Sequence, residues 1–570
     1  MAQHISIRVP WKDNGYNGKV CDKPCYNTSC LRLKNISETR DDSIESMLAG
    51  KNIKGHEEEI PCLSEGGCFM SEEEYNKITV YPYKSNNSKT HSHFRETVLH
   101  YPPFSFPARP FAWTMLHKSG QFNDENIETL VKKYGIDYNA DREPDLSFRT
   151  NWVQDATNQR AIFKTFYENV EENKSLVIPY AKQVPFIDDA RRVVIGIGFV
   201  TSITEPPEHE HTDEGKIRSI LWKTMIGHSI RDDRHNGFLM PYREMMDYAE
   251  THPDFDINSV TVIADDEFFD EFSYATEHVS YDAVISVLLQ IIKSLEIIKK
   301  CIPGNWNECI KWTRDRLNEV WIDRGVFPGL SSMLYAIGIK NNYVIANKIK
   351  KIVTDESCFE AKVEEIFGNP KRYFNVNELE QLGKTEIKTF LGLSKERKHL
   401  FWLMARMSLT DVQAKIIFNK EERISVGINV TDIEIIENPY IVYEKTRNLP
   451  SEYVVSVKKI DMSVFPPEII RDINSLEEPS VVESNNDNRR IRAYVISQLE
   501  EEALNGHTVY PMDFIISHIN ELPIEPECHI TGDIMHSIVD FLEREMAIIT
   551  CEDGSIAYQL NRLKKFDDII

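Results

Sequence analysis

The alternation of apolar and polar residues predicts strands and a helix in the first half of the chain. Between Met1 and Pro10 polar and β-branched residues alternate, which is typical of a strand. Asn158–Glu172 has helical spacing, whereas Arg192–Ile203 is an apolar, β-branched run. This run contains two glycines, so we expect a buried strand that another part of the chain approaches closely.

The second half of the chain is mainly helical by the same criterion. Apolar residues recur at helical spacing from Val284 to Ile298, after a plausible cap at Ser280. Farther on, Gly338 separates two short apolar helices within Gly329–Ile349. This is the layout of a helix-hairpin-helix, whose turn amides can hold a phosphate, and it also fits an ordinary helix pair with a glycine turn.

The last segment predicts three helices followed by a hairpin. The helices are expected at Arg489–Leu504, Tyr510–Asn520 and Ile530–Arg544. Residues Met546–Leu560 then alternate around the turn Asp553-Gly554, which is typical of a β-hairpin. This order predicts a winged helix-turn-helix.

The patterns together predict a multidomain α+β protein. The expected parts are a Cys/His-rich N-terminal domain at 1–145, an α/β domain at 146–278, a helical domain with a helix-hairpin-helix-like element at 279–420, an extended connector and linker at 421–488, and the winged helix at 489–570.

Composition places the chain among soluble globular proteins and restricts its partners. Charged residues make up 27% of the sequence, and no apolar run is long enough to span a membrane, so we expect a cytoplasmic protein without membrane contact. The formal net charge is −24, which repels nucleic acid on average. Any DNA contact must therefore come from local basic surface.

Five cysteines in the first domain are candidates for a zinc site or an iron–sulfur cluster. They are Cys21, Cys25, Cys30, Cys62 and Cys68. Their spacing permits convergent thiolates but matches neither a CxxC knuckle nor a ferredoxin pattern, which favours buried or incidental thiols over a metal site.

A second polar cluster precedes the turn Asn236-Gly237. His228, Ser229, Arg231 and Asp232 crowd together there, and they could form a pocket for a phosphate or a base or merely a capped turn. A metal-dependent nuclease using these His and Asp side chains is a further alternative. The nearby His- and Glu-rich stretch Glu205–Lys216 is expected to be an exposed acidic loop.

Basic residues at the ends of the winged helix are the candidates for DNA contact. Arg489, Arg490 and Arg492 begin its first helix, and Lys564 and Lys565 follow the hairpin. With Gly338 and Lys340 of the helix pair, they form the expected phosphate-binding set. The third helix is acidic, however, and many winged helices serve only as protein–protein spacers.

Known catalytic motifs are missing from the sequence. It contains no G-x-x-x-x-G-K-[ST] phosphate loop, no G-x-S-x-G elbow and no H-E-x-x-H helix. Glu386-Ile387-Lys388 resembles the end of a nuclease motif, but such triplets are common by chance. No catalytic residue is therefore predicted.

Several segments resemble RecD-like superfamily 1 DNA helicases. The resemblance is carried by RRIRAYVISQLEEEALNGHTVYPMDFIISHINEL (Arg489–Leu522), by ERISVGINVTDIEIIENPYIVYE (Glu422–Glu444) and by the hairpin near Gly338. In that family, tandem helix-hairpin-helix elements precede an ATP-driven motor. The resemblance therefore implies DNA as a partner, and ATP only if a motor follows Ile570, as the ending RLKKFDDII suggests.

Upstream segments look like the amino-terminal half of large RecD-like ATPases. They are HISIRVPWKDNGYNGKVC, FPARPFAWTML and RGVFPGLSSMLYAIG. This resemblance implies a part in genome defence, with other defence proteins as partners. The leading hypothesis is thus the DNA-binding and regulatory half of such a helicase. The alternative is a non-enzymatic scaffold or sensor that recognises a partner protein or a modified nucleotide.

Overall fold

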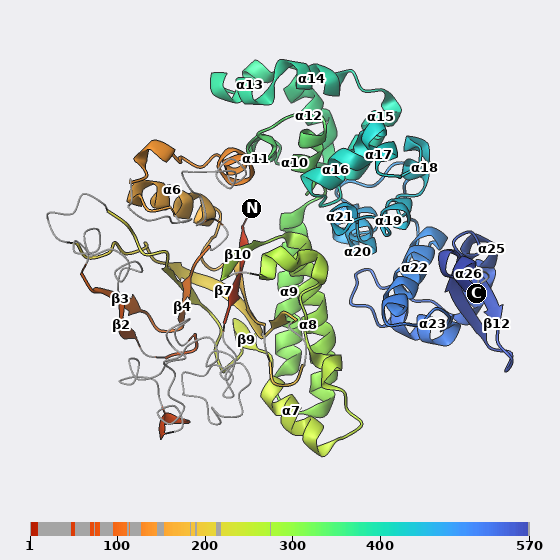
Figure 1. Cartoon of the computed structure of the whole chain (residues 1–570), viewed down its shortest axis with the longest axis horizontal. Helices are drawn as coiled ribbons and strands as arrows, with labels where there is room; N and C mark the ends of the chain where they lie inside the picture. Colours follow the sequence, from red (N-terminus) through yellow and green to blue (C-terminus); the bar gives the residue numbers. More distant parts are fainter. Residues whose placement is uncertain are drawn as a thin grey trace. The chain divides into compact units, whose positions relative to one another are not determined.

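The structure is a computed structural model that divides into two compact units, Met1–Asp323 and Arg324–Ile570. It describes residues 2–9, 47–51, 69–72, 74–79, 95–110, 113, 127–144, 153–182, 184–187, 191–211, 218–273 and 275–567. The first unit contains a mixed sheet with helices, and the second is mainly helical (Figure 1). The expected α+β class with more than one unit is therefore confirmed.

The main sheet of the first unit draws strands from distant parts of the chain. Six strands follow the order β10–β1–β5–β7–β8–β4, while β6 pairs with β5 and β9 with β7. The β1–β5 pair is parallel, and the other pairs are antiparallel. The strands are β1 (His4–Arg8), β4 (Ser105–Ala108), β5 (Leu176–Ala181), β6 (Val193–Val194), β7 (Gly196–Ile203), β8 (Thr224–His228), β9 (Gly237–Leu239) and β10 (Thr276–Val279), and a separate pair is formed by β2 (Tyr75–Thr79) and β3 (Thr97–Tyr101).

Strand β1 confirms the expected first strand but is buried on both faces. It lies between β5 and β10, and the polar His4 and Ser6 are buried like its two isoleucines, whereas Arg8 at its end is exposed. Most of the buried polar groups have partners: His4 Nδ1 accepts a hydrogen bond of 2.9 Å from the Leu176 amide, and Ser6 donates to the carbonyl of Glu271. His4 Nε2 is buried without a hydrogen-bond partner among the described residues.

The glycines of β7 allow the close approach that the sequence predicts. A Cβ on Gly196 would lie 2.7 Å from the Phe238 carbonyl oxygen, and one on Gly198 would lie 2.7 Å from Ile230. Strand β9 and the chain after β8 therefore pack directly against the backbone of β7.

The helices of the first unit do not follow the expected domain boundaries. They are α6 (Ala156–Tyr167), α7 (Tyr242–Thr251), α8 (Tyr281–Cys301) and α9 (Trp306–Arg324). No division exists near residue 145, because β1 and β4 belong to the same sheet as the later strands. Trp312 of α9 packs on Phe199 of β7, with 5.6 Å between ring centroids, so α8 and α9 lie within the first unit and the helical unit begins only at Arg324.

The second unit is helical through the region expected to be an extended connector. Its helices up to residue 471 are α10 (Leu330–Ala336), α11 (Asn342–Ile352), α12 (Phe359–Gly368), α13 (Val376–Leu382), α14 (Lys384–Leu391), α15 (Lys395–Ala405), α16 (Asp411–Phe418), α17 (Lys420–Ser425), α18 (Asp432–Glu437), α19 (Ile441–Thr446), α20 (Val457–Val464) and α21 (Glu468–Arg471). Between α21 and α22 lies a polar stretch, residues 472–486, which we call the polar stretch before Asp487. Even there, Ser480 and Val482 are buried. The expectation of an extended connector at 421–488 is therefore wrong, because its apolar residues pack into the helical core.

Residues 489–570 contain the expected order of helices and hairpin. The elements are α22 (Asn488–Leu504), β11 (Tyr510–Pro511), α23 (Met512–Asn520), α24 (Gly532–Ser537), α25 (Val539–Leu542), β12 (Met546–Thr550), β13 (Ile556–Leu560) and α26 (Asn561–Asp567). The hairpin turn is confirmed, with Gly554 at φ +82°. The third expected helix is broken at Ile538 into α24 and α25. We call residues 489–567 the C-terminal module.

Within the described ranges, no helix is both long and apolar enough to cross a membrane.

Candidate nucleic-acid interface

The glycine turn between α10 and α11 has the geometry expected of a helical hairpin. Gly338 is exposed at φ +107°, while Ile337 and Ile339 on either side are buried. The amides of all three residues close the end of α10, because they donate to Met333, Tyr335 and Leu334 respectively. We call residues 330–352 the Gly338 hairpin.

A second hairpin repeats this turn. Gly427, at φ +90°, separates α17 from α18 between Val426 and the buried Ile428. The amides of these three residues donate four, three and five positions back along the chain, the same offsets as in the Gly338 hairpin. Gly427 was not among the residues predicted from the sequence, although the pattern apolar-Gly-apolar in SVGIN matches AIGIK.

The two hairpins differ at the start of their second helix. Helix α18 begins with a capping box, in which the Thr431 side chain accepts a hydrogen bond from the Glu434 amide. Helix α11 follows Asn341, which makes no side-chain cap, and its first turn carries no acidic residue. At the start of α11 the Asp411 carboxylate accepts a hydrogen bond of 2.9 Å from the Asn342 side chain. Because no side chain caps α11, we expect an external anion there rather than at α18.

A buried carboxylate also occupies the start of α18. Asp432 is 1% exposed and lies 2.6 Å from Arg423 and 3.2 Å from Arg397. Burial would raise the pKa of Asp432, but hydrogen bonds from Arg423 and Lys420 hold it below its ordinary value. The start of α18 therefore already carries a negative charge, which would repel a phosphate.

The surroundings of the Gly338 hairpin are positive on one side and negative on the other. Lys340 is exposed directly after the turn, and Lys351 is exposed at the end of α11. Glu386 of α14 lies against Gly338, because a Cβ there would be 3.4 Å from its Cγ. An anion would thus meet the Lys340 side of the turn rather than the Glu386 side.

Two of the three arginines expected to contact phosphate are buried in ion pairs. Arg490 is fully buried and binds Asp461 through Nε and Nη2, each at 2.8 Å. Arg492 is 5% exposed and binds Glu444 at 2.9 and 3.0 Å. Their expected role as phosphate contacts is therefore corrected: both guanidinium groups hold the C-terminal module against α19 and α20.

Arg489 is also engaged inside the second unit. Its guanidinium binds Asp487 at 2.7 Å and donates to the backbone carbonyls of Glu437 and Pro479 at 2.8 and 3.2 Å. These contacts join the start of α22 to α18 and to the stretch before Asp487. Arg489 thus has little surface left for a phosphate.

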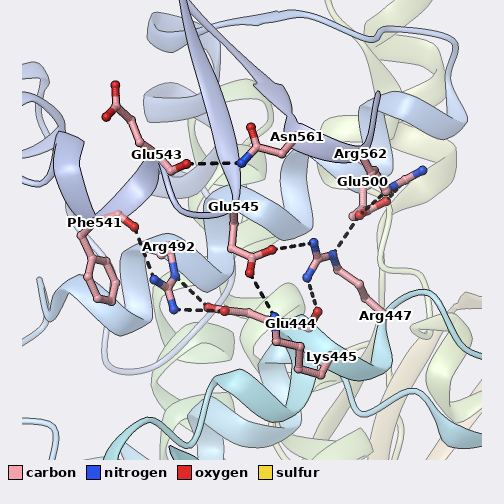
Figure 2. A network of polar contacts seen from close by, with 10 residues as sticks. All are labelled: Glu444, Lys445, Arg447, Arg492, Glu500, Phe541, Glu543, Glu545, Asn561 and Arg562. Atoms are coloured by element: carbon pink, nitrogen blue, oxygen red, sulfur yellow. Dashed lines mark hydrogen bonds and ion pairs between the residues drawn. The ribbon is translucent and has the colours of Figure 1, made fainter. Parts of the chain in front are cut away.

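Further ion pairs extend this attachment of the C-terminal module (Figure 2). Arg447, which directly follows α19, lies 3.0 Å from Glu500 and 3.1 Å from Glu545. Arg562 binds the same Glu500, and Lys445 binds Glu545 at 3.2 Å. Several basic residues of the region are therefore used internally. Lys564 and Lys565, by contrast, are exposed on α26, where a DNA contact remains a prediction.

The polar cluster at 228–232 forms a packed turn. His228 is 1% exposed, stacks on Phe69 at 4.2 Å and lies 2.8 Å from its carbonyl oxygen, and burial lowers its pKa to about 3. Ser229 accepts from the Phe199 amide at 2.8 Å, and Arg231 donates to the His228 carbonyl at 2.8 Å.

These contacts support the capped-turn alternative for the cluster. Asp232 is exposed, but His228 offers no open surface to a base, a phosphate or a metal ion. The pocket expected at His228, Ser229, Arg231 and Asp232 is therefore corrected, and with it the nuclease alternative that used His228.

The expected metal site lies outside the described residues. Cys21, Cys25, Cys30, Cys62 and Cys68 are all in segments that the structure does not describe. Among the residues that it does describe, no group of three or more His, Cys, Asp or Glu side chains could hold a metal ion. The zinc or iron–sulfur site therefore stays a prediction.

Comparison with known proteins gives no relative. No family model matches the chain, and no curated protein and no solved structure matches it. The resemblance to RecD-like helicases thus stays a prediction from the sequence.

Proposed function

We propose that residues 324–570 bind the sugar-phosphate backbone of DNA through the Gly338 hairpin, as the DNA-engaging and regulatory part of a RecD-like helicase. In such a machine an ATP-driven motor would supply the strand separation, and other proteins of a bacterial defence system would be partners. The C-terminal module, whose element order fits a winged helix, would brace the assembly without phosphate contacts from Arg490 or Arg492.

The observation that supports this proposal is the uncapped start of α11 beside Lys340. Helix amides without a capping side chain attract anions. The positive charge of the neighbouring Lys340 adds to this attraction. Such contacts recognise the phosphate backbone and not the base sequence. The proposed binding is therefore independent of sequence and sensitive to salt.

Salt-titrated binding of single- and double-stranded DNA to the full chain tests the proposal. Lys340→Glu should weaken binding for all sequences alike and lower the slope of log affinity against log salt by roughly one unit. Glu386→Gln should strengthen binding, because it removes the carboxylate next to Gly338.

Lys371→Glu is the matched control. Lys371 is exposed in the same unit, and the substitution changes the net charge by the same amount. If Lys371→Glu weakens DNA binding as much as Lys340→Glu, the effect is one of total charge and the hairpin has no special role. If the unaltered chain shows no salt-dependent DNA binding, the proposal fails.

A further inference from the structure

The C-terminal module exposes a group of large apolar and aromatic side chains where α22 leads into α23. Leu504 is 90% exposed, Phe514 is 61% exposed and Val509 is 38% exposed. The rings of His507, Tyr510 and Phe514 form a chain, with centroids 6.3 and 6.0 Å apart. We call these five residues the Phe514 face. Water-exposed apolar side chains of this size, gathered within eleven positions, are typical of an interaction surface.

An ordered backbone holds the Phe514 face. Tyr510 pairs with Tyr558 of β13, which is fully buried, and Ile515 on the other side of α23 is fully buried as well. The aromatic side chains are therefore presented by a packed scaffold. Binding of a partner would therefore cost little conformational entropy in this surface.

The stretch of chain that carries the Phe514 face is acidic. Residues 493–543 contain ten Asp and Glu but no Lys or Arg. Glu501 and Asp513 are exposed beside the face, and Glu502 hydrogen-bonds Tyr510. A nucleic acid would be repelled here, whereas a cationic partner would be attracted.

We propose that the Phe514 face is the docking site for a basic polypeptide segment of another protein, with apolar side chains that cover Phe514 and Leu504. Amphipathic helices with lysine or arginine on the opposite side have this chemistry. Aromatic side chains at the centre of such a contact usually supply most of the binding energy. The proposal uses none of the residues of the Gly338 hairpin and does not depend on the proposed DNA binding.

Binding of a labelled model peptide to the full chain tests this proposal. The probe is an amphipathic helix of about 18 residues with leucine on one face and lysine on the other, and its partner probe carries glutamate in place of lysine. The lysine peptide should bind, and Phe514→Ser and Leu504→Ser should each weaken it by about tenfold. The glutamate peptide should not bind.

Val376→Ser is the matched control, because Val376 is 71% exposed on α13, outside the Phe514 face. Equal weakening by Val376→Ser and Phe514→Ser would mean that binding does not depend on the Phe514 face in particular, and the proposal would be overturned. Failure of the lysine peptide to bind would also overturn it. So would either of two other occupants: an oligothymidine strand that binds and is lost in Phe514→Ser, or a dimer of this chain that the same substitution dissociates.

Discussion

Asp461 is the centre of a buried cluster that joins three segments of the second unit. Its carboxylate accepts hydrogen bonds from Arg490, from Tyr440 and, at 2.9 Å, from Tyr494. Burial, and then the charge of Asp461, raise the pKa of both tyrosines well above the ordinary value, so each stays a neutral donor. A buried charge pair of this kind adds little net stability compared with apolar packing, but loss of one partner is costly.

Asp461→Ala should therefore destabilise the second unit by about 3–5 kcal/mol, because the Arg490 guanidinium would stay buried without its counter-charge. The measurement is the free energy of unfolding in urea. Glu365→Ala is the control: it breaks the exposed pair with Lys362 and should cost at most about 1 kcal/mol. Equal costs for the two substitutions would contradict the structural role of Asp461.

The same residues show what sequence alone could not provide. The sequence marked Arg490 and Arg492 as basic residues at a helix start, which suggested phosphate contact. Their partners lie 29 and 48 positions away in the chain, and no periodic pattern connects them. Whether an arginine faces solvent or a buried carboxylate is decided by tertiary packing.

Elements whose signal is local were predicted well. Helix α22 and the β12–β13 hairpin match the expected segments within one residue or so, because capping, turn glycines and alternation are properties of neighbouring residues. The Gly338 hairpin belongs to the same class, since a short apolar-Gly-apolar pattern defines its turn. The Gly427 turn carries the same pattern but was not predicted. The break between α24 and α25 carried no comparable signal.

Replacement of the hairpin glycines should cost similar amounts of stability. Gly338→Ala and Gly427→Ala each place a side chain at positive φ, and we expect about 1–2 kcal/mol for each in urea unfolding. A Cβ on Gly427 would meet no atom within 4 Å, so its cost would come from backbone conformation alone. Gly368→Ala, in helix α12 and equally free of contacts, should be neutral or slightly stabilising. A cost there as large as at Gly427 would argue against backbone strain as the cause.

At the scale of the whole molecule, the sheet of the first unit was the least predictable feature. Strand β1 pairs with β10, some 270 positions later, and β4 joins the far edge beside β8. Sequence patterns predicted β1 and β7, but such patterns do not reveal which strands are neighbours. The boundary expected at residue 145 therefore cut through a single sheet.

Burial of histidines makes the first unit sensitive to acid. Burial lowers the pKa of His4 and His228 to about 3 and that of His209 to about 4, well below the value near 6.5 of an unfolded chain. Below pH 6.5 the unfolded state therefore binds more protons than the folded state. The stability that each neutral, buried histidine contributes is fully present above that pH. As the pH drops toward the folded pKa, the free energy of unfolding falls by about 1.4 kcal/mol per pH unit for each histidine.

We expect the first unit to lose most of its stability near pH 5. His228→Gln keeps a donor for the Phe69 carbonyl but removes the group that takes up a proton on unfolding. Between pH 6 and 4.5 it should reduce the slope of the unfolding free energy against pH by about 1.4 kcal/mol per pH unit, the effect of one proton. His235→Gln at an exposed position should leave the slope unchanged. An unaltered slope in His228→Gln would show that this histidine titrates normally in the folded state.

The buried pairs of the second unit also limit how this chain can change over generations. The acids lie on one side of the polar stretch before Asp487, at Glu444 and Asp461, and their bases lie on the other, at Arg490 and Arg492. That stretch looks like a convenient joint for exchanging modules between genes. An exchange there would nevertheless separate each acid from its base and leave two carboxylates facing a foreign surface. We therefore expect the segments before and after the stretch to be inherited as one block, and a working chimera to need its junction on the amino-terminal side of Tyr440.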